Sequence, residues 1–276
     1  SISGNGCRGI YTTIKSLGDF IPPLIKHLNT HMNYLLLSAG GMGSTILQRL
    51  ITLVYHIENV EIINTHDIVN KVLMLDSDNN VRRNGKIQYG QSLKEIQSIL
   101  ENSNTNTSLM SRLSKDHIDF RKDNAQDTNK FYEFLKKFYE KQIFCERENV
   151  FELAMSLSIK QKSQVYNIFS DEHRKAVSEV SNVDERFFIE KINGYLDYRG
   201  WIADNFANAD VVSYEDLITN TDDVLAKITG YKDTLRKHFG LPMSTILRLE
   251  YQNKNLSDQE SIALSLYKKL CDTLIK

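Results

Sequence analysis

One segment of the chain, Ser38-Ala-Gly-Gly-Met-Gly-Ser-Thr45, constrains the fold more than any other. It ends the short apolar run that begins at Asn33, and the residues after it are apolar at helical spacing: Ile46, Leu47, Leu50, Ile51 and Val54. The pattern predicts a strand, a glycine turn and a helix. Consecutive N–H groups and the helix dipole at such a turn form an anion site, and glycine lets the backbone approach a phosphate closely. An ordinary tight turn is the alternative.

Other apolar runs and helical patterns alternate along the chain. Further strands are predicted at Val60–Asn64, Val72–Leu75, Gln142–Glu146 and Ala209–Tyr214. Helices are predicted at Lys130–Glu140, Asn149–Ser158, Asp184–Ala207, Asp222–Ile228 and Ser257–Leu274. A break near Gly200 is one option for the long helix Asp184–Ala207, and a capping box opens the last. Alternation of this kind predicts an α/β fold with a mainly parallel sheet flanked by helices, whose ligands bind beyond the carboxyl ends of the strands.

The length of the chain, 276 residues, suits one large α/β domain over residues 1–276. The stretch from about 76 to 129 is polar and rich in Asn, Ser, Asp and Lys. Clusters of such residues between periodic segments are typical of loops. We therefore expect this stretch to be an insertion or a mobile lid.

Charge and apolar patterning exclude several classes of partner. The net charge of −1 gives no general attraction to a polyanion, so nucleic acid is not an expected partner. The longest apolar runs are far below the ~20 residues that a membrane span needs, which predicts no membrane span. The three cysteines, Cys7, Cys145 and Cys271, are scattered and odd in number. This argues against a disulfide framework or a cysteine-based metal site and favours a reducing, cytoplasmic setting.

The glycine turn differs from the loop of ATP- and GTP-hydrolysing proteins. Their motif places Lys directly after the last glycine, whereas here Ser44 follows Gly43 and no Lys occurs between residues 38 and 45. Magnesium-dependent nucleotide hydrolysis is therefore disfavoured.

The segment Gly43-Ser-Thr-Ile-Leu-Gln-Arg-Leu-Ile51 resembles the 5′-phosphosulfate loop of the sulfotransferase family. Two positions differ: Gly40 stands where the family has Pro, and Gly41 where it has Arg or Lys. The resemblance implies a three-layer P-loop-type fold and 3′-phosphoadenosine 5′-phosphosulfate (PAPS) as cofactor. The residues that it assigns to cofactor binding in the loop are Gly40, Gly41, Met42, Gly43, Ser44 and Thr45.

Two later segments extend the resemblance in the order of the family. The run from Cys145 to Leu157 is similar to the 3′-phosphate segment of bacterial-type sulfotransferases, which implies that Arg147 and Ser156 hold the 3′-phosphate. A permanently charged guanidinium suits that role. A surface ion pair of Arg147, for example with Glu148 or Glu152, is the alternative.

The third segment, from Val211 to Ile218, resembles the family's late strand with its Tyr-Glu-Asp-Leu signature. Further similarity continues to Phe239-Gly-Leu-Pro242. We interpret this match as structural, with Glu215 or Asp216 capping or charging the N-terminus of a helix.

Sulfuryl transfer needs a base for the proton of the acceptor and positive charge near the transferred group. The family commonly has a His or Glu base just beyond its second strand, and His66 and Asp67 follow the predicted strand Val60–Asn64. They are the catalytic candidates, with capping of the next helix as the alternative. The loop lacks the Arg or Lys that the family has there. A lid formed by the polar stretch could supply this positive charge instead, through Arg82, Arg83 or Lys86.

The sequence therefore predicts a sulfotransferase that moves a sulfuryl group from PAPS to a hydroxyl or amine of a small-molecule or glycan acceptor. A protein that has the fold but not the activity, acting as a structural or binding component of a protein assembly, is the main alternative. A nucleoside or nucleotide kinase is a third.

Overall fold

The computed structural model of the chain describes residues 31–87, 90–164, 171–180, 182–250 and 256–274, so Cys7 lies outside the described residues. In chain order the elements are β1 (Tyr34–Leu37), α1 (Ser44–Ile57), β2 (Ile62–Asp67), β3 (Lys71–Leu75), β4 (Val81–Ile87), α2 (Leu93–Glu101), β5 (Ser108–Leu113), α3 (Lys115–Arg121), α4 (Ala125–Phe138), β6 (Lys141–Glu146), α5 (Val150–Ser163), α6 (Asp171–Ser178), α7 (Glu185–Asn205), β7 (Asp210–Ser213), α8 (Tyr214–Thr219), α9 (Thr221–Thr229), α10 (Thr234–Phe239), α11 (Met243–Glu250) and α12 (Asp258–Leu274).

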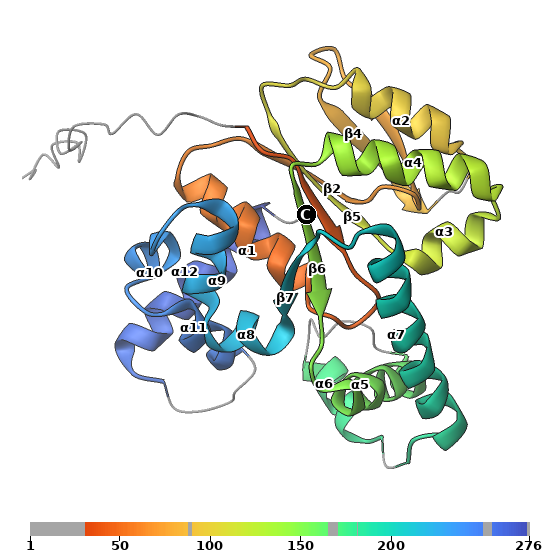
Figure 1. Cartoon of the computed structure of the whole chain (residues 1–276). Coiled ribbons are helices and arrows are strands. Elements are labelled where there is room, and N and C mark those ends of the chain that lie inside the picture. Colours follow the sequence, from red (N-terminus) through yellow and green to blue (C-terminus); the bar gives the residue numbers. More distant parts are fainter. Residues whose placement is uncertain (1–30, 88–89, 165–170, 181, 251–255, 275–276) are drawn as a thin grey trace, which may run out of the picture. The chain divides into compact units, whose positions relative to one another are not determined.

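A five-stranded parallel sheet in the order β2-β5-β1-β6-β7 forms the centre of the fold (Figure 1). β1 pairs Leu37 with Leu113 of β5 on one side and with Phe144 of β6 on the other. Its four apolar residues are fully buried, as expected of a central strand covered on both faces. The predicted α/β class with a mainly parallel sheet is confirmed.

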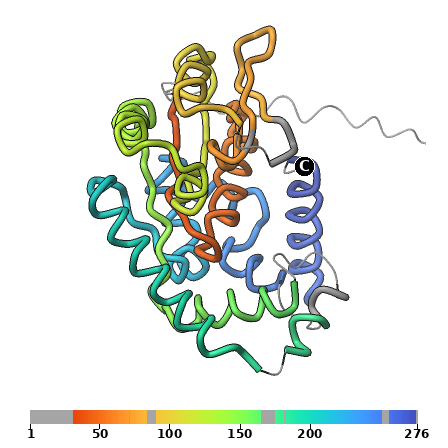
Figure 2. Tube along the Cα trace, turned by 90° about the vertical axis from the view of Figure 1, so that its right-hand side faces the viewer, coloured from red at the N-terminus to blue at the C-terminus, as the bar shows by residue number. Residues whose placement is uncertain are grey.

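Helices cover both faces of this sheet. α1 lies on one face and packs against α9, α10 and α12 from the C-terminal part of the chain. On the other face, Tyr132 of α4 makes edge contacts with Trp201 of α7 and with Phe206 just after it. α2 and α4 lie side by side in both views of the molecule (Figures 1 and 2). The result is three layers, helix on sheet on helix.

The stretch predicted as an insertion or lid contains the strand β5, which pairs with both β1 and β2. That part of the prediction is wrong, because residues 108–113 lie within the central sheet. Ser108 and Ser111 are fully buried in it, with the Ser111 hydroxyl 2.7 Å from that of Thr65 and 2.6 Å from that of Tyr139. Serines whose hydroxyls find partners can occupy a buried strand, although they make the strand look like a loop in the sequence.

β3 and β4 form a separate antiparallel hairpin beside α2. The carbonyl of Asn79 at its tip accepts a hydrogen bond from the Asn104 N–H, at 2.8 Å, ahead of β5. The tip therefore lies toward the amino edge of the sheet, with Arg82 bound to Asp76 at 2.8 Å. Arg82 thus lies toward the amino edge, away from the carboxyl ends of the strands that the glycine turn follows, and its role as a cation for the turn stays a prediction. Arg83 is opposite Leu73 in the hairpin, and the Lys86 side chain lies outside the described residues.

The long helix α7 runs through Gly200 without interruption, so the break there is not observed. At the start of α12 the predicted capping box is present: Ser257 accepts from the Glu260 N–H at 3.3 Å, and the Glu260 carboxylate accepts from the Ser257 N–H at 2.9 Å. An equivalent box, Ser92 with Glu95, opens α2, which the sequence analysis did not predict.

Candidate functional site

The order of the strands places the glycine turn where the chain leaves the sheet toward both faces. From β1 the chain passes through α1 to β2 at one end of the sheet, whereas from β6 it passes through α5 and α7 to β7 at the other. Beyond the carboxyl ends of β1 and β6 the connections therefore diverge. Crevices at such a switch point are the usual ligand sites of open α/β sheets. Ser38 and Arg147, which directly follow these two strands, both border it.

The glycine turn is packed between α5 and α8. Gly41 has φ +85°, and a Cβ there would lie 2.9 Å from Leu153 and 3.2 Å from Leu157 of α5. Gly43 has φ +84°, and a Cβ there would lie 2.6 Å from the ring of Tyr214 in α8. A side chain at either position would meet both backbone strain and a collision. Gly40 has space by comparison, with Leu157 at 3.9 Å.

The turn leads into the N-terminus of α1, whose first turn carries no acidic residue. Gly43 is the N-cap and makes no side-chain cap, while Ser44 is buried with its hydroxyl 2.8 Å from that of Ser38. Thr45 is exposed in the first turn. A helix N-terminus of this kind presents N–H groups and positive potential, which favour an anion.

Met42 is buried inside the turn, and its Sδ lies 3.4 Å from the Ala39 N–H. One N–H of the turn is therefore already directed at a protein atom. Sulfur is a weak acceptor, so a stronger anionic acceptor could replace this contact.

Arg147 lies close to the turn through Tyr214. Its guanidinium stacks 3.9 Å above the Tyr214 ring, the same ring that borders Gly43. Its side chain is only 12% exposed and contacts two carboxylates, Glu215 at 3.1 Å and Glu152 at 3.3 Å. The alternative considered for Arg147, an ion pair with Glu152, is therefore present. The Tyr195 hydroxyl also bridges the Arg147 N–H and carbonyl, which fixes the backbone.

Glu215 links α8 to the start of α5. Its carboxylate accepts from the N–H groups of Glu148 at 3.1 Å and Asn149 at 3.4 Å. The predicted role of Glu215, charging a helix N-terminus, is confirmed: it lies in the first turn of α8 and also accepts from the N–H groups at the start of α5. Ser156, the second predicted 3′-phosphate residue, is half-buried on α5, and its hydroxyl makes no hydrogen bond to the described residues.

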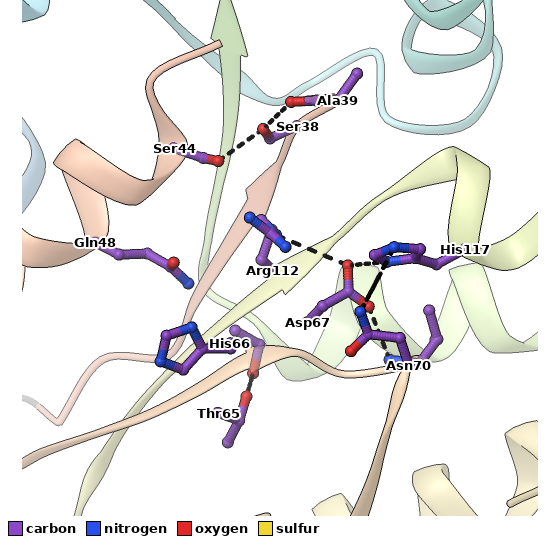
Figure 3. Close-up of polar contacts among 12 residues, drawn as sticks. Ser38, Ala39, Ser44, Gln48, Thr65, His66, Asp67, Asn70, Arg112 and His117 are labelled. Atoms are coloured by element: carbon purple, nitrogen blue, oxygen red, sulfur yellow. Dashed lines mark hydrogen bonds and ion pairs between the residues drawn. The ribbon is translucent and has the colours of Figure 1, made fainter. Parts of the chain in front are cut away.

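Asp67 and His66 end β2, but the structure separates their side chains. The pairing with β5 shifts between Asn64 and His66, which leaves Thr65 as the extra residue of a bulge. His66 adopts φ +56°, and its N–H donates to the Asn64 side chain at 2.9 Å. In Figure 3 the His66 ring lies on the side of Gln48 from α1, away from the Asp67 carboxylate. The two candidates therefore do not act as neighbours.

Asp67 is 1% exposed and faces two residues that the sequence analysis did not select (Figure 3). His117 of α3 places Nδ1 2.7 Å from its carboxylate, and Arg112 of β5 places Nε 3.8 Å away. The Asn70 amide nitrogen lies 3.3 Å from Nδ1 and 3.5 Å from Nε2 of His117, so a base at Nε2 would exchange this long contact for the proton of the acceptor. Nothing next to His117 in the sequence indicates this role. Its partner Asp67 lies 50 residues away and is brought close by the pairing of β2 with β5.

This arrangement can perform acid–base chemistry. A carboxylate that accepts from Nδ1 holds the imidazole in one orientation and tautomer, in which Nε2 can accept a proton. Arg112 brings a permanent positive charge to the same edge of the sheet. The Asp67 backbone is opposite Arg112, and Arg112 is opposite Leu36, so the backbones of Asp67 and Leu36 lie about 10 Å apart across two strand spacings.

A cavity of about 440 Å³ is lined by Tyr214, whose ring borders Gly43, and by Ile46, which follows the glycine turn. Its walls come from α1, α8 and α11, and its lining residues are Ile46, Tyr214, Ile218, Thr219, Ser244, Thr245, Leu247 and Arg248. Tyr214 thus contacts the turn, Arg147 and the cavity. Its size and mixed lining suit a small organic group.

Neither a metal-binding cluster nor a membrane-spanning helix is found in the described part of the chain. Within the described residues, no group of three or more His, Cys, Asp or Glu side chains is placed to hold a metal ion. None of the helices in the described part of the chain has the length and apolar character that a membrane span needs.

Comparison of the chain with protein-family models and with curated proteins finds no match in either case.

Proposed function

We propose that the chain is a sulfotransferase that moves a sulfuryl group from PAPS to a hydroxyl or amine of a small-molecule or glycan acceptor. The observation that carries the proposal is the glycine turn at the switch point, joined by Tyr214 to a largely buried arginine and to a cavity. A donor with two separate anionic groups on one nucleoside needs such a set of sites.

In this proposal each part of the donor has its own contacts. The 5′-phosphosulfate lies at the N–H groups of the turn and of the first turn of α1. The 3′-phosphate is held by Arg147 and the Ser156 hydroxyl, and the adenosine occupies the cavity beside Tyr214. Glu152 is 65% exposed at the side chain, so the phosphate can displace it from Arg147 at little cost.

The proposed reaction is a direct displacement at sulfur. The acceptor oxygen or nitrogen forms a bond to the sulfur, and the bond from sulfur to the bridging oxygen of the phosphosulfate breaks. The products are the sulfated acceptor and 3′-phosphoadenosine 5′-phosphate, and the acceptor's proton passes to a base. We assign this role to Nε2 of His117, because the Asp67 carboxylate, 2.7 Å from Nδ1, fixes the orientation of the ring.

A second function is favoured by specific observations: a protein that has the same fold and serves as a structural or binding component of a protein assembly. Gly41 leaves the turn without a cation, and Arg147 is already paired with two carboxylates. Both features reduce the positive potential that stabilises a transferring sulfuryl group.

Calorimetric titration with 3′-phosphoadenosine 5′-phosphate separates the two. We expect binding, and we expect Arg147→Ala to weaken it by roughly 2–3 kcal/mol, the scale of a charge-assisted hydrogen-bonded contact. Arg199→Ala is the matched control, because Arg199 pairs at 3.1 Å with Glu146, the residue before Arg147. Arg147→Lys should recover part of the loss.

Three results would count against the enzyme. No detectable binding at millimolar ligand favours the assembly component, and magnesium-dependent ATP binding favours a kinase. Binding without sulfuryl transfer to any of a broad panel of alcohols, amines and glycans also favours the component. If transfer is observed, His117→Ala should lower turnover by about 100-fold or more.

A further inference from the structure

The glycine turn cannot carry a cation of its own. Residues 38–45 include no Lys or Arg, and the positive φ of Gly41 combines with the close approach of Leu153 and Leu157 to exclude a long side chain there. A phosphosulfate nevertheless carries negative charge that has to be balanced in a partly dry site. A cation for this group must come from an element packed on the turn. Of the two that pack there, α8 contains no Lys or Arg, which leaves α5.

One lysine lies on the face of α5 that contacts the turn. Leu153, Leu157 and Lys160 are spaced i, i+4 and i+7, which places them along one side of the helix. Helical side chains lean toward the N-terminus, so the Lys160 stem covers the turn of α5 that holds Leu157. Leu157 is in turn the residue that approaches Gly40 and Gly41.

Lys160 lies in partly dry surroundings close to a second positive charge. The side chain is half-buried, and its pKa is lowered from the ordinary value of a lysine, first by burial and then by the positive charge of Arg147. No acidic side chain of the described residues forms an ion pair with Lys160. Two neighbouring cations that lose hydration repel each other, and a bound anion removes this cost.

We propose that Lys160 supplies the cation at the 5′-phosphosulfate of the donor, in place of one in the glycine turn. The inference rests on the proposed function and adds a binding residue to it. Lys160 lies against the 5′ end of the donor, while Arg147 and Ser156 hold the 3′ end.

Lys162 provides a matched control on the same helix. It is two residues further along, is exposed, and donates to the Asn182 carbonyl at 2.5 Å instead of facing the turn. Lys160→Met and Lys162→Met remove the same charge and keep a similar apolar stem. Because the Lys160 ammonium is partly desolvated, Lys160→Met should be at least as stable to heat as the wild type, whereas a purely structural lysine would lower stability.

The test uses two probes that differ in one group: 3′-phosphoadenosine 5′-phosphate and adenosine 3′-phosphate. By calorimetry, Lys160→Met should lower affinity for the first probe by roughly 10- to 100-fold and leave affinity for the second unchanged. Lys160→Arg should restore most of the affinity, and Lys162→Met should bind both probes like the wild type.

The outcomes distinguish the two proposals. If the wild type binds neither probe, the proposed function fails, and the role of Lys160 with it. If the wild type binds the first probe and Lys160→Met binds it equally well, only the role of Lys160 fails. An equal loss for both probes places Lys160 at the 3′ end and also overturns the inference.

Discussion

Asp67 shows how one buried side chain organises the edge of the sheet. Its carboxylate accepts from His117 and from the Val69 N–H at 3.2 Å, and it faces Arg112. Ionised groups of this kind are tolerated inside proteins only when several partners replace the lost hydration. The same contacts fix the orientation of the His117 ring, so stability and the proposed base depend on one residue.

We predict that Asp67→Asn lowers the free energy of unfolding by about 2–3 kcal/mol, because an amide cannot replace the charge opposite Arg112 and His117. Urea denaturation measures this. Asp119→Asn is the control, since Asp119 is exposed and pairs with Lys115 on the surface, where such pairs contribute under about 1 kcal/mol. Equal losses for the two variants would show that the Asp67 cluster adds nothing beyond a surface pair.

A second prediction concerns Cys145, which is 2% exposed on β6. Burial raises the pKa of its thiol from 9.0 to about 12. Between these values the unfolded chain loses the thiol proton and the folded chain keeps it, so stability is complete below pH 9 and falls as the pH rises. For this one group the slope is at most about 1.4 kcal/mol per pH unit.

Urea denaturation at a series of pH values from about 8 to 11 measures the effect of Cys145. Cys145→Ala is less stable near neutrality, because it leaves a small cavity, but its stability should fall less steeply above about pH 9. Parallel curves for the variant and the wild type would contradict the assignment.

The residues of the candidate site were predictable to different degrees. The glycines and Arg147 follow strands in the sequence, so their places at the edge of the sheet could be predicted from periodicity alone. The partnership of Asp67 with His117 could not, because it depends on a bulge at Thr65 and on the pairing of β2 with β5, both of which are tertiary.

At the scale of the elements, two glycines show opposite requirements. Gly43 ends the turn at a positive φ with no room for a Cβ, whereas Gly200 lies within α7, where a Cβ would have no neighbouring atom within 4 Å. A glycine in a helix interior costs conformational entropy, but a glycine in a left-handed turn relieves strain.

We therefore predict that Gly43→Ala destabilises the protein by about 2 kcal/mol or more, through backbone strain and displacement of the Tyr214 ring. Gly200→Ala should stabilise it by about 0.5–1 kcal/mol. Thermal unfolding of both variants measures the two signs. A stabilising effect at Gly43 would show that the turn does not require the left-handed conformation.

The elements that could be predicted are those with clear periodicity. β1, β6 and α7 are apolar at the expected spacing, and their existence follows from burial of one face or both. β5 was missed because it contains two serines, Ser108 and Ser111, that are buried in the sheet. The Ser111 hydroxyl is satisfied by Thr65 and Tyr139, which lie far away in the sequence. Sequence patterns detect apolar burial and not burial through hydrogen bonds.

At the scale of the whole molecule, the order β2-β5-β1-β6-β7 assembles the candidate site from distant segments. The class of fold followed from the alternation of strands and helices, but this order did not, because a strand hidden in the polar stretch takes the place beside β1. The order puts the glycine turn, Arg147 and Tyr214 at one edge of the sheet and the tip of the β3–β4 hairpin toward the other.

Because the proposed site and the hairpin tip lie toward opposite edges of the sheet, we can predict where 3′-phosphoadenosine 5′-phosphate slows hydrogen exchange. A ligand at about 100 times its dissociation constant stabilises the native state by about 2.7 kcal/mol, which slows every amide that exchanges through global unfolding. Amides that exchange through local opening respond only where the ligand makes contact. We expect local protection at residues 38–45, 147–157, 214–219 and 244–248, and none at the hairpin tip, residues 76–80.

The same experiment on Arg147→Ala separates contact from general tightening of the fold. If Arg147 holds the 3′-phosphate, the variant should lose local protection at residues 147–157 once the ligand concentration is raised to give the same occupancy, while residues 38–45 stay protected. Because the two groups of amides follow different strands of one sheet, a ligand that bound elsewhere could not protect both. Local protection at the hairpin tip without protection of the turn would place the ligand at the amino edge and contradict the proposed site.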